Sequence, residues 1–227
     1  SLLTGEWNDF HFDVMDTPCY ADFIPETLSA LRVADGSVVV IDAVAGIDVG
    51  TERVWRYASE LRLPRMLYVN KMDREEIDVA DLLDQIQARF GREAVAIQHP
   101  LASGPGFHQV VDLLEMKLIT YADGKAEVGN IPEAIAEEAS TLHEHLVEAV
   151  AETDEELMET YFGDGGLDAG ALKAGLRKAV LSRQLFPVLF GDAYNNVAVD
   201  RLLQSVADLF PSPVESPGLG FADADGN

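Results

Sequence analysis

The chain is poor in cysteine and in long apolar segments, and each scarcity excludes a class of protein. A single cysteine, Cys19, among 227 residues excludes an internal disulfide and favours a reducing compartment such as the cytoplasm. Apolar runs such as Val38 to Ile41 are far shorter than the ~20 residues that cross a bilayer, and no charged-then-apolar leader opens the chain. We therefore expect a cytoplasmic protein with no membrane partner.

Basic residues are also scarce. The chain has 16 Lys and Arg against 40 Asp and Glu, which gives a formal net charge of −24. A surface of this charge opposes broad contacts with phosphates, so we expect neither DNA as a partner nor an extensive RNA-binding surface. The length suits one large domain, or a domain with a substantial insertion, whose core needs no covalent staples.

The first third of the sequence alternates predicted strands and helices. Residues 10–14 alternate apolar and polar side chains, whereas Val38 to Ile41 and residues 66–69 are apolar runs typical of strands buried on both faces. Helical periodicity covers residues 24–34 and 51–61 between them. This βαβαβ order predicts an α/β fold with a doubly wound, mostly parallel sheet, whose ligands bind at the carboxyl ends of the strands.

The rest of the chain predicts helices and one more strand around an irregular insertion. Regularity falls through Gly104-Pro105-Gly106 and Asp123-Gly124. Further helices are expected over residues 78–90, 132–151, 154–162, 167–181 and 197–209, with a strand over 185–190. Residues 214–227 contain Pro, Gly and Asp without periodicity, which predicts a linker or disordered tail.

Residues 70–73 read Asn-Lys-Met-Asp and follow the third predicted strand, where such a sheet presents loops to ligands. A carboxylate at Asp73 can accept hydrogen bonds from guanine N1–H and the exocyclic amine, whereas adenine offers neither donor. An unmet polar partner can give roughly 10⁴-fold discrimination. The stem of Lys71 can lie along the base while its ammonium stays in water, and Asn70 can tether neighbouring loops. The tetrapeptide is therefore typical of a guanine-reading loop.

Taken alone, the same tetrapeptide is equally compatible with ordinary loop chemistry. Asn and Asp favour turns and helix caps, so Asp73 could simply cap the helix that follows. The neighbouring motifs decide between the two interpretations.

Those motifs resemble elongation factor G in the same order along nearly the whole chain. The matching segments are residues 16–18, 21–23, 31–36, 51–55, 69–73, 109–113, 155–158 and 209–213. The resemblance implies a P-loop GTPase-like domain that binds GTP or GDP with Mg²⁺ and works on the ribosome. It divides the chain into GTP-binding segments, residues 1–98 and 166–213, and an α+β insertion subdomain, residues 99–165.

Gly191-Asp192-Ala193 follows the last predicted strand and corresponds to the Gly-Ser-Ala loop of this family. The resemblance implies that the Ala193 amide donates to guanine O6. Asp192 departs from the family's serine and adds a carboxylate near the base, but a backbone contact survives the change. Without the other motifs, these three residues would be interpreted as a turn.

Asp16 ends the first predicted strand, and the resemblance implies that it binds Mg²⁺ through water. Cys19 stands at the family's glycine position, whose amide meets the γ-phosphate, and its Cβ disfavours backbone excursions that glycine permits. Tyr20 stands at the position of the catalytic histidine, where a hydroxyl of pKa about 10 can orient water but supplies no imidazole-like charge near neutral pH. This tyrosine indicates a divergent branch of elongation-factor-G-like proteins. A small half-buried thiol and a packed aromatic ring are equally compatible with these two residues.

The phosphate-binding motif G-x-x-x-x-G-K-[ST] is absent from the sequence, and the only Gly-Lys pair, Gly124-Lys125, lacks its context. That loop supplies the amides and lysine for the phosphates and a hydroxyl ligand for Mg²⁺. Because the first residue is also not methionine, we expect this sequence to begin after the phosphate loop of a longer factor. Alone, it should bind GTP weakly and be inactive.

Two functional hypotheses follow. In the first, the segment reads guanine in a GTPase that couples hydrolysis to translation elongation. In the second, Cys19 and Tyr20 mark a regulatory module that binds ribosomes without efficient hydrolysis. The acidic helices over residues 132–162 are either solvated faces or, by the resemblance, a contact for the ribosomal stalk protein. An unrelated α/β domain with accidental motifs is the remaining alternative.

Overall fold

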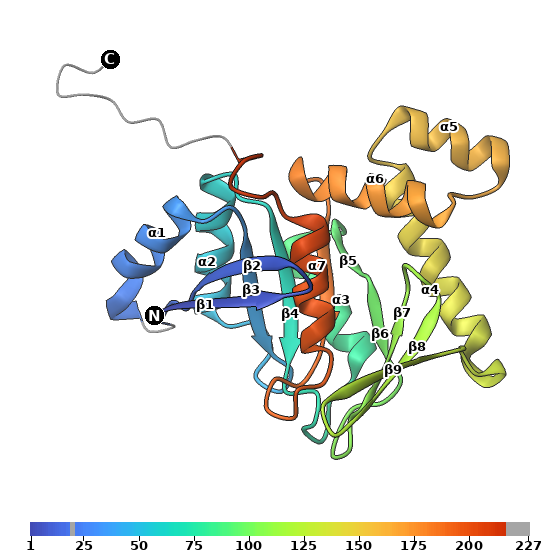
Figure 1. Cartoon of the computed structure of the whole chain (residues 1–227), viewed down its shortest axis with the longest axis horizontal. Coiled ribbons are helices and arrows are strands. Elements are labelled where there is room, and N and C mark those ends of the chain that lie inside the picture. Colours follow the sequence, from blue (N-terminus) through green and yellow to red (C-terminus); the bar gives the residue numbers. More distant parts are fainter. Residues whose placement is uncertain (19–20, 217–227) are drawn as a thin grey trace.

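The structure is a computed structural model that describes residues 1–18 and 21–216 (Figure 1). Cys19, Tyr20 and residues 217–227 of the predicted linker lie outside the described residues. The described residues form a central parallel sheet between layers of helices, with a two-stranded and a four-stranded antiparallel sheet beside it.

The central sheet has four parallel strands. Their order across the sheet is β3 (Ser37–Asp42), β4 (Arg65–Asn70), β10 (Phe186–Phe190) and β5 (Ala94–Ala96). Every residue of β10 is buried, as expected of a strand covered on both faces. The structure thus confirms the predicted mostly parallel α/β sheet.

Aspartate caps define the start of several helices. The helices are α1 (Ile24–Val33), α2 (Val49–Glu60), α3 (Val79–Phe90), α4 (Glu133–Ala151), α5 (Glu155–Asp164), α6 (Ala169–Leu181) and α7 (Val199–Leu209), and a short 3-10 helix, Ala21–Phe23, precedes α1. The side chains of Asp48, Asp78, Asp154 and Asp168 accept hydrogen bonds from backbone N–H groups in the first turns of α2, α3, α5 and α6. These four helices accordingly begin close to the predicted positions.

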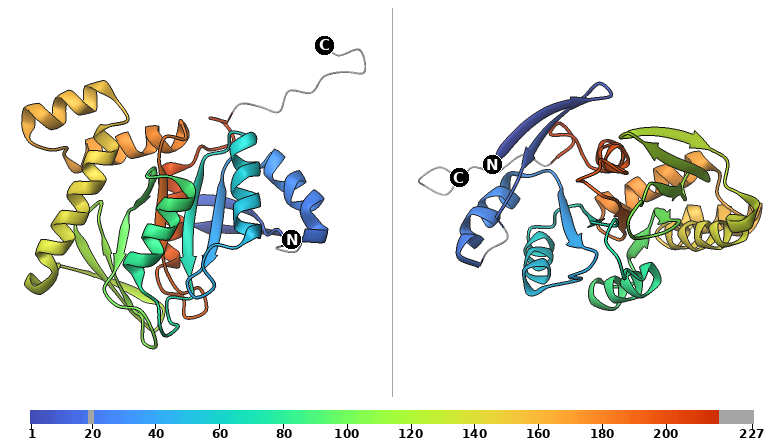
Figure 2. Two further views of the ribbon diagram at one scale, coloured as in Figure 1. Left: turned by 180° about the vertical axis from the view of Figure 1, so that it is seen from behind. Right: turned by 90° about the horizontal axis from the view of Figure 1, so that it is seen from below.

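Alternate residues of β4 face two separate hydrophobic cores. Met66 and Tyr68 lie in one core with buried residues of α4, α6 and α7. Leu67 and Val69 lie in the other with buried residues of α3, and Trp55 of α2 packs against it. Figure 2 shows α3 and α7 on opposite sides of the sheet, so both faces of the sheet are covered.

The prediction that residues 10–14 extend the central sheet is wrong. They lie in β2 (Phe10–Met15), which pairs antiparallel with β1 (Leu2–Trp7) in a sheet of its own. Asn8 and Asp9 join the strands with φ of 45° and 66°, as a two-residue type I′ hairpin turn requires. The local turn brings β1 to β2, so the backbone of β2 finds its partners within the hairpin.

The insertion contains an antiparallel sheet, in agreement with the α+β subdomain that the resemblance implied, although the local sequence pattern gave no strands there. Its strands, in spatial order, are β6 (Gln98–Pro100), β7 (Gln109–Asp112), β8 (Lys117–Ala122) and β9 (Lys125–Gly129). Ile97 joins this sheet to the central one: its N–H donates to Val188 O at 3.1 Å, and its carbonyl accepts from Leu113 N at 3.1 Å. The two sheets are therefore hydrogen-bonded to the same residue.

Helices α4, α5 and α6 follow this sheet and complete the insertion side of the molecule (Figure 1). His143 in α4 lies with Nδ1 2.7 Å from Leu113 O, which ties the helix to the strand end. Arg177 in α6 pairs with both carboxylate oxygens of Glu215 at 2.9 and 3.1 Å, so the first residues of the predicted linker contact the domain. Within residues 1–18 and 21–216, no helix has the length and apolar character needed to span a bilayer.

Candidate guanine-nucleotide site

Two predicted site loops come together because β4 and β10 are neighbours in the sheet. Val69 pairs with Phe190, so the loops that follow leave the same edge. The Ala193 N–H donates to Asn70 Oδ1 at 2.9 Å, and the Met72 N–H donates to Gly191 O at 3.2 Å. The side chain of Asn70 therefore ties the Asn-Lys-Met-Asp loop directly to the Gly-Asp-Ala loop.

The structure excludes the interpretation of Asp73 as a helix cap. Helix α3 begins at Val79, and its cap is Asp78, whose Oδ1 accepts from Asp81 N at 3.0 Å. The Asp73 side chain is 24% exposed, and its nearest cationic neighbour is Arg74, with 3.8 Å between Nε and Oδ1. At this distance the pair is an ion pair without a close hydrogen bond. The half-buried carboxylate of Asp73 is thus available to a ligand.

Lys71 contacts the end of a third strand. Its backbone has φ of 67°, and its ammonium lies 2.5 Å from Asp42 Oδ2. Asp42 ends β3, and its other carboxylate oxygen accepts from Val44 N at 2.9 Å and Ala45 N at 3.1 Å. The hydrogen bond from Lys71, followed by these backbone N–H groups, lowers the pKa of Asp42 against the opposing effect of burial.

Asp42 was not among the predicted site residues, although a signal for it was present in the sequence. It follows the buried run Val38 to Ile41, at the strand end where a parallel sheet places ligand-binding side chains. The pairing of Asp42 with Asn70 across β3 and β4 then brings it next to the Asn-Lys-Met-Asp loop.

Gly191 is needed for the close approach of its loop to β4. A Cβ built at this residue would lie 2.1 Å from Tyr68 Oη and 2.7 Å from Val197 O. Tyr68 is buried, and its hydroxyl has no hydrogen-bond partner among the described residues. Burial raises the pKa of Tyr68, and the carboxylates of Asp192 and Asp200 raise it further, so the hydroxyl stays protonated.

The Asp192 side chain turns into its own loop. It is 1% exposed, and its Oδ1 accepts from Tyr194 N at 3.0 Å and Asn195 N at 3.3 Å. Asn195 Nδ2 donates to the other carboxylate oxygen. The carboxylate stands where the family has serine, and it stabilises the turn because it accepts these hydrogen bonds. The carboxylate that the sequence adds to this loop is thus engaged by donors of the loop itself.

The predicted catalytic and metal-binding residues are placed only in part. Asp16 follows β2 with an exposed side chain, whose Oδ2 accepts from Ser1 Oγ at 3.2 Å. Within residues 1–18 and 21–216, no group of three or more His, Cys, Asp or Glu side chains is arranged to hold a metal ion. Mg²⁺ commonly uses one or two carboxylates with water and substrate phosphates, so a single exposed aspartate has suitable donor chemistry. Cys19 and Tyr20 lie outside the described residues.

A parallel sheet with helices on both faces, whose adjacent strand ends carry Asn-Lys-Met-Asp and Gly-Asp-Ala loops, is the arrangement of a GTP-binding domain. The family model of the elongation factor Tu GTP-binding domain matches residues 1–212. The chain belongs to this family, which makes it a GTP-binding domain of the translational GTPase class.

A crystal structure of a protein from Thermus thermophilus has a similar fold. The two chains are 31% identical in sequence, and the superposition has a TM-score of 0.87. The match covers 94% of this chain and 32% of the Thermus chain. This chain therefore spans about a third of the length of that relative.

Proposed function

We propose that this chain is the guanine-recognising part of an elongation-factor-G-like GTPase and that Asp73 is the carboxylate that reads the base. The observation that carries the proposal is the bond from the Ala193 N–H to Asn70 Oδ1, which unites two loops at adjacent strand ends. Asp73 caps no helix, so its oxygens can accept from guanine N1–H and the 2-amino group.

The remaining contacts support the base-reading loops in different ways. Asp42 holds the Lys71 ammonium, so the apolar stem of the lysine can lie against the face of the base. The Ala193 N–H would donate to guanine O6 in competition with Asn70 Oδ1. In this proposal, Gly191 and Asp192 contribute to nucleotide binding indirectly, because they fix the backbone of the loop.

We propose one residue for each of the metal and phosphate contacts. Asp16 would hold Mg²⁺ through water, and the backbone N–H of Cys19 would meet the γ-phosphate. No phosphate-loop motif occurs in these 227 residues, so we propose that this chain by itself recognises the base and binds GTP or GDP weakly.

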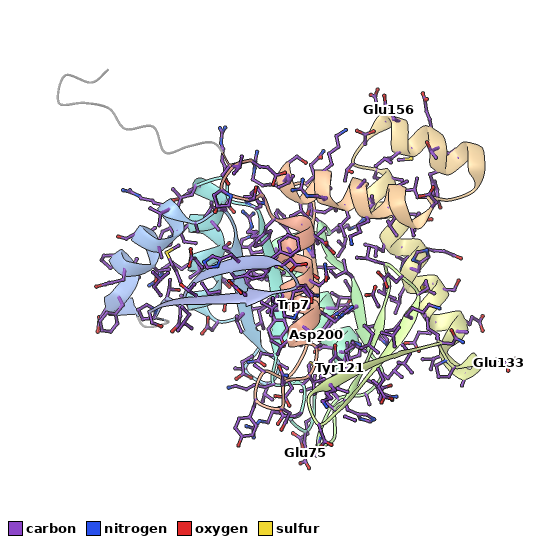
Figure 3. All side chains as sticks on the ribbon, in the orientation of Figure 1. Trp7, Glu75, Tyr121, Glu133, Glu156 and Asp200 are labelled. Atoms are coloured by element: carbon purple, nitrogen blue, oxygen red, sulfur yellow. The ribbon has the colours of Figure 1, made fainter. Side chains whose placement is uncertain are left out.

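We further propose that the parent protein works in the cytoplasm on the ribosome, within a divergent branch related to elongation factor G. The acidic helices α4 and α5 are the surface that we propose for a ribosomal stalk protein. Glu155 and Glu156 in the first turn of α5 and Glu133 in the first turn of α4 contribute to their negative charge. Figure 3 shows Glu133 and Glu156 at the outer limits of this part of the molecule.

A regulatory module without efficient hydrolysis is the second candidate. Cys19 and Tyr20, which replace the glycine and histidine of elongation factor G, favour it. GTP turnover by the intact parent protein, with and without ribosomes, separates the two candidates. If Tyr20→His raises a near-zero rate, the regulatory candidate is supported; efficient turnover by the unmodified protein contradicts it.

Base recognition is tested by replacing Asp73 with Asn in the intact parent protein. The carboxamide can donate to a 2-keto group, so we expect the preference to move from GTP toward xanthosine triphosphate. Competition binding with the two triphosphates measures the shift.

Asp78→Asn is the matched control for this substitution, because asparagine also caps helices well and α3 should remain intact. The control should keep the preference for GTP. An unchanged preference in Asp73→Asn would remove Asp73 from base reading.

A further inference from the structure

The insertion sheet, β6 to β9, contacts both loops of the candidate site. In the connection between β6 and β7, the Gly104 N–H donates to Met72 O at 2.8 Å. At the turn between β8 and β9, Gly124 O accepts from Asn196 Nδ2 at 3.4 Å. The base-reading loops extend from the central sheet, and hydrogen bonds to the insertion sheet hold them at a second place.

Among the described residues, Tyr121 makes the shortest side-chain hydrogen bond between the insertion sheet and the segment that follows β10. It lies on β8 and is 6% exposed, and its hydroxyl donates to Asp200 Oδ1 at 2.6 Å (Figure 3). Asp200 lies in the first turn of α7, and its Oδ2 is 3.1 Å from Arg201 Nη2. Burial raises the pKa of Tyr121, and the bond to Asp200 raises it further, so the phenol remains the donor.

The loop from Gly191 to Ala198 joins β10 to α7. Reciprocal bonds between Asp192 and Val197, at 3.0 and 2.9 Å, close it at its base. Asn196 and Ala198 have φ of 55° and 60°, a left-handed conformation that asparagine adopts readily but that disfavours alanine. Contacts at the start of α7 therefore help to keep the loop in its observed conformation.

We propose that Tyr121 is a positioning residue for guanine recognition, which acts through Asp200. By fixing the first turn of α7 immediately after Ala198, it holds the loop that presents Gly191, Asp192 and Ala193. The insertion sheet thereby sets the geometry of base reading. This inference rests on the proposed function of the two loops.

The test measures hydrogen exchange of backbone amides in the whole chain by NMR. Tyr121→Phe removes the hydroxyl and therefore its hydrogen bond to a charged acceptor. We expect the amides of Asp192 and Val197 to exchange about tenfold faster, while the amides of the central strands keep their rates.

Tyr161→Phe is the matched control. Its hydroxyl donates to Glu148 Oε1 at 3.1 Å, between α5 and α4, away from both loops. The control should leave the Asp192 and Val197 amides unchanged. Equal exchange in the two variants would overturn the proposal, and so would a uniform acceleration over the whole chain, which indicates a general loss of stability.

Two substitutions at Asp200 separate the hydrogen bond from side-chain size. Asp200→Asn keeps an acceptor oxygen and should preserve slow exchange, whereas Asp200→Ala should reproduce Tyr121→Phe. In the double variant Tyr121→Phe, Asp200→Ala, the two effects should not add. Additive effects would show that the residues act independently and would contradict the proposal.

A titration with millimolar GDP, monitored by NMR chemical shifts, tests whether the position of the loop affects guanine recognition. Tyr121→Phe should weaken GDP binding several-fold, and Tyr161→Phe should leave it unchanged. Equal GDP affinity in the two variants would overturn the positioning role. If the unmodified chain gives no guanine-specific shifts at residues 70–73, the proposed function fails, while the exchange rates still decide whether Tyr121 holds the loop.

Discussion

Lys71 has a left-handed backbone, with φ of 67°, in a residue that carries a long side chain. This conformation disfavours residues with a Cβ, and here it accompanies the ion pair with Asp42. Together with the bond from Ala193 to Asn70, this ion pair links the ends of three strands, β3, β4 and β10. Side chains at single positions thus fix the relative placement of loops that belong to distant parts of the chain.

The Lys71 to Asp42 ion pair predicts a pH dependence of stability. The hydrogen bond from Lys71 lowers the pKa of Asp42 in the folded protein below the unfolded value of 3.8. The folded state therefore binds this proton less readily than the unfolded state. The stabilisation is fully present above the unfolded pKa and disappears as the pH falls through the lower folded pKa.

Urea unfolding between pH 6 and pH 3 measures this effect. In Asp42→Asn, the free energy of unfolding should fall less steeply below about pH 4 than in the unmodified protein, because one linked group is gone. Asp73→Asn is a suitable comparison because Asp73 has no short hydrogen bond to a cation. Equal pH profiles for the unmodified protein and Asp42→Asn would contradict the role of this pair.

At the scale of secondary-structure elements, α2 and α6 end in the same way. Arg62 and Arg183 follow the last turns of the helices with φ of 56° and 64°. In α2, Arg62 N donates to Ser59 O and Leu63 N to Ala58 O, both within 3.0 Å. The bonds of Arg183 and the residue after it repeat the pattern in α6. Both ends are Schellman motifs, in which the left-handed position is usually glycine.

Arg62→Gly should therefore stabilise the protein. Removing the Cβ relieves the cost of the left-handed conformation, which exceeds the added chain entropy of glycine by about 0.5–1 kcal/mol. Arg56→Gly, inside the same helix, should lower the free energy of unfolding by about 1 kcal/mol. Chemical denaturation of both variants measures the signs, and a loss of stability in Arg62→Gly would show that the Arg62 side chain contributes more than its backbone conformation costs.

The elements differ in how far local sequence determines them. Helices were predictable because caps such as Asp78 and Asp154 stand beside periodic apolar residues. Strands β3, β4 and β10 were predictable because a strand buried on both faces reads as an apolar run. Strands β5 to β9 depend on pairing with partners elsewhere in the chain, and none of them is a wholly buried apolar run like β10.

The candidate site was predictable in outline for the same reason. Asn70, Asp73 and Ala193 follow recognisable strands, so their loops could be expected at one edge of the sheet. The pairing of Asp42 with Lys71 and the inward turn of Asp192 depend on three-dimensional contacts between side chains and backbone. The separate β1–β2 hairpin also escaped prediction, because nothing in the pattern of residues 10–14 distinguishes a hairpin partner from a sheet partner.

At the scale of the whole molecule, the net charge of −24 predicts a dependence on salt. Like charges repel one another more strongly in the folded chain than in the expanded one, and the Debye length is only about 10 Å at 0.1 M salt. Added NaCl should therefore raise the unfolding temperature near neutral pH. Thermal unfolding at 10 mM and 200 mM NaCl measures the shift.

The increase should shrink as the pH approaches the isoelectric point of about 4.3, where the net charge approaches zero. A decrease in unfolding temperature with salt at neutral pH would show that specific ion pairs outweigh the general repulsion.

The position of β10 between β4 and β5 has a consequence for the order of folding. Both neighbours precede it by many residues in the sequence, and the four-stranded insertion sheet is synthesised between them and β10. As the chain emerges during synthesis, β4 is left with an open edge until residues 186–190 appear. The centre of the sheet is thus completed late, by a contact of long sequence separation, and a chain stalled before β10 would present the apolar strand β4 to aggregation.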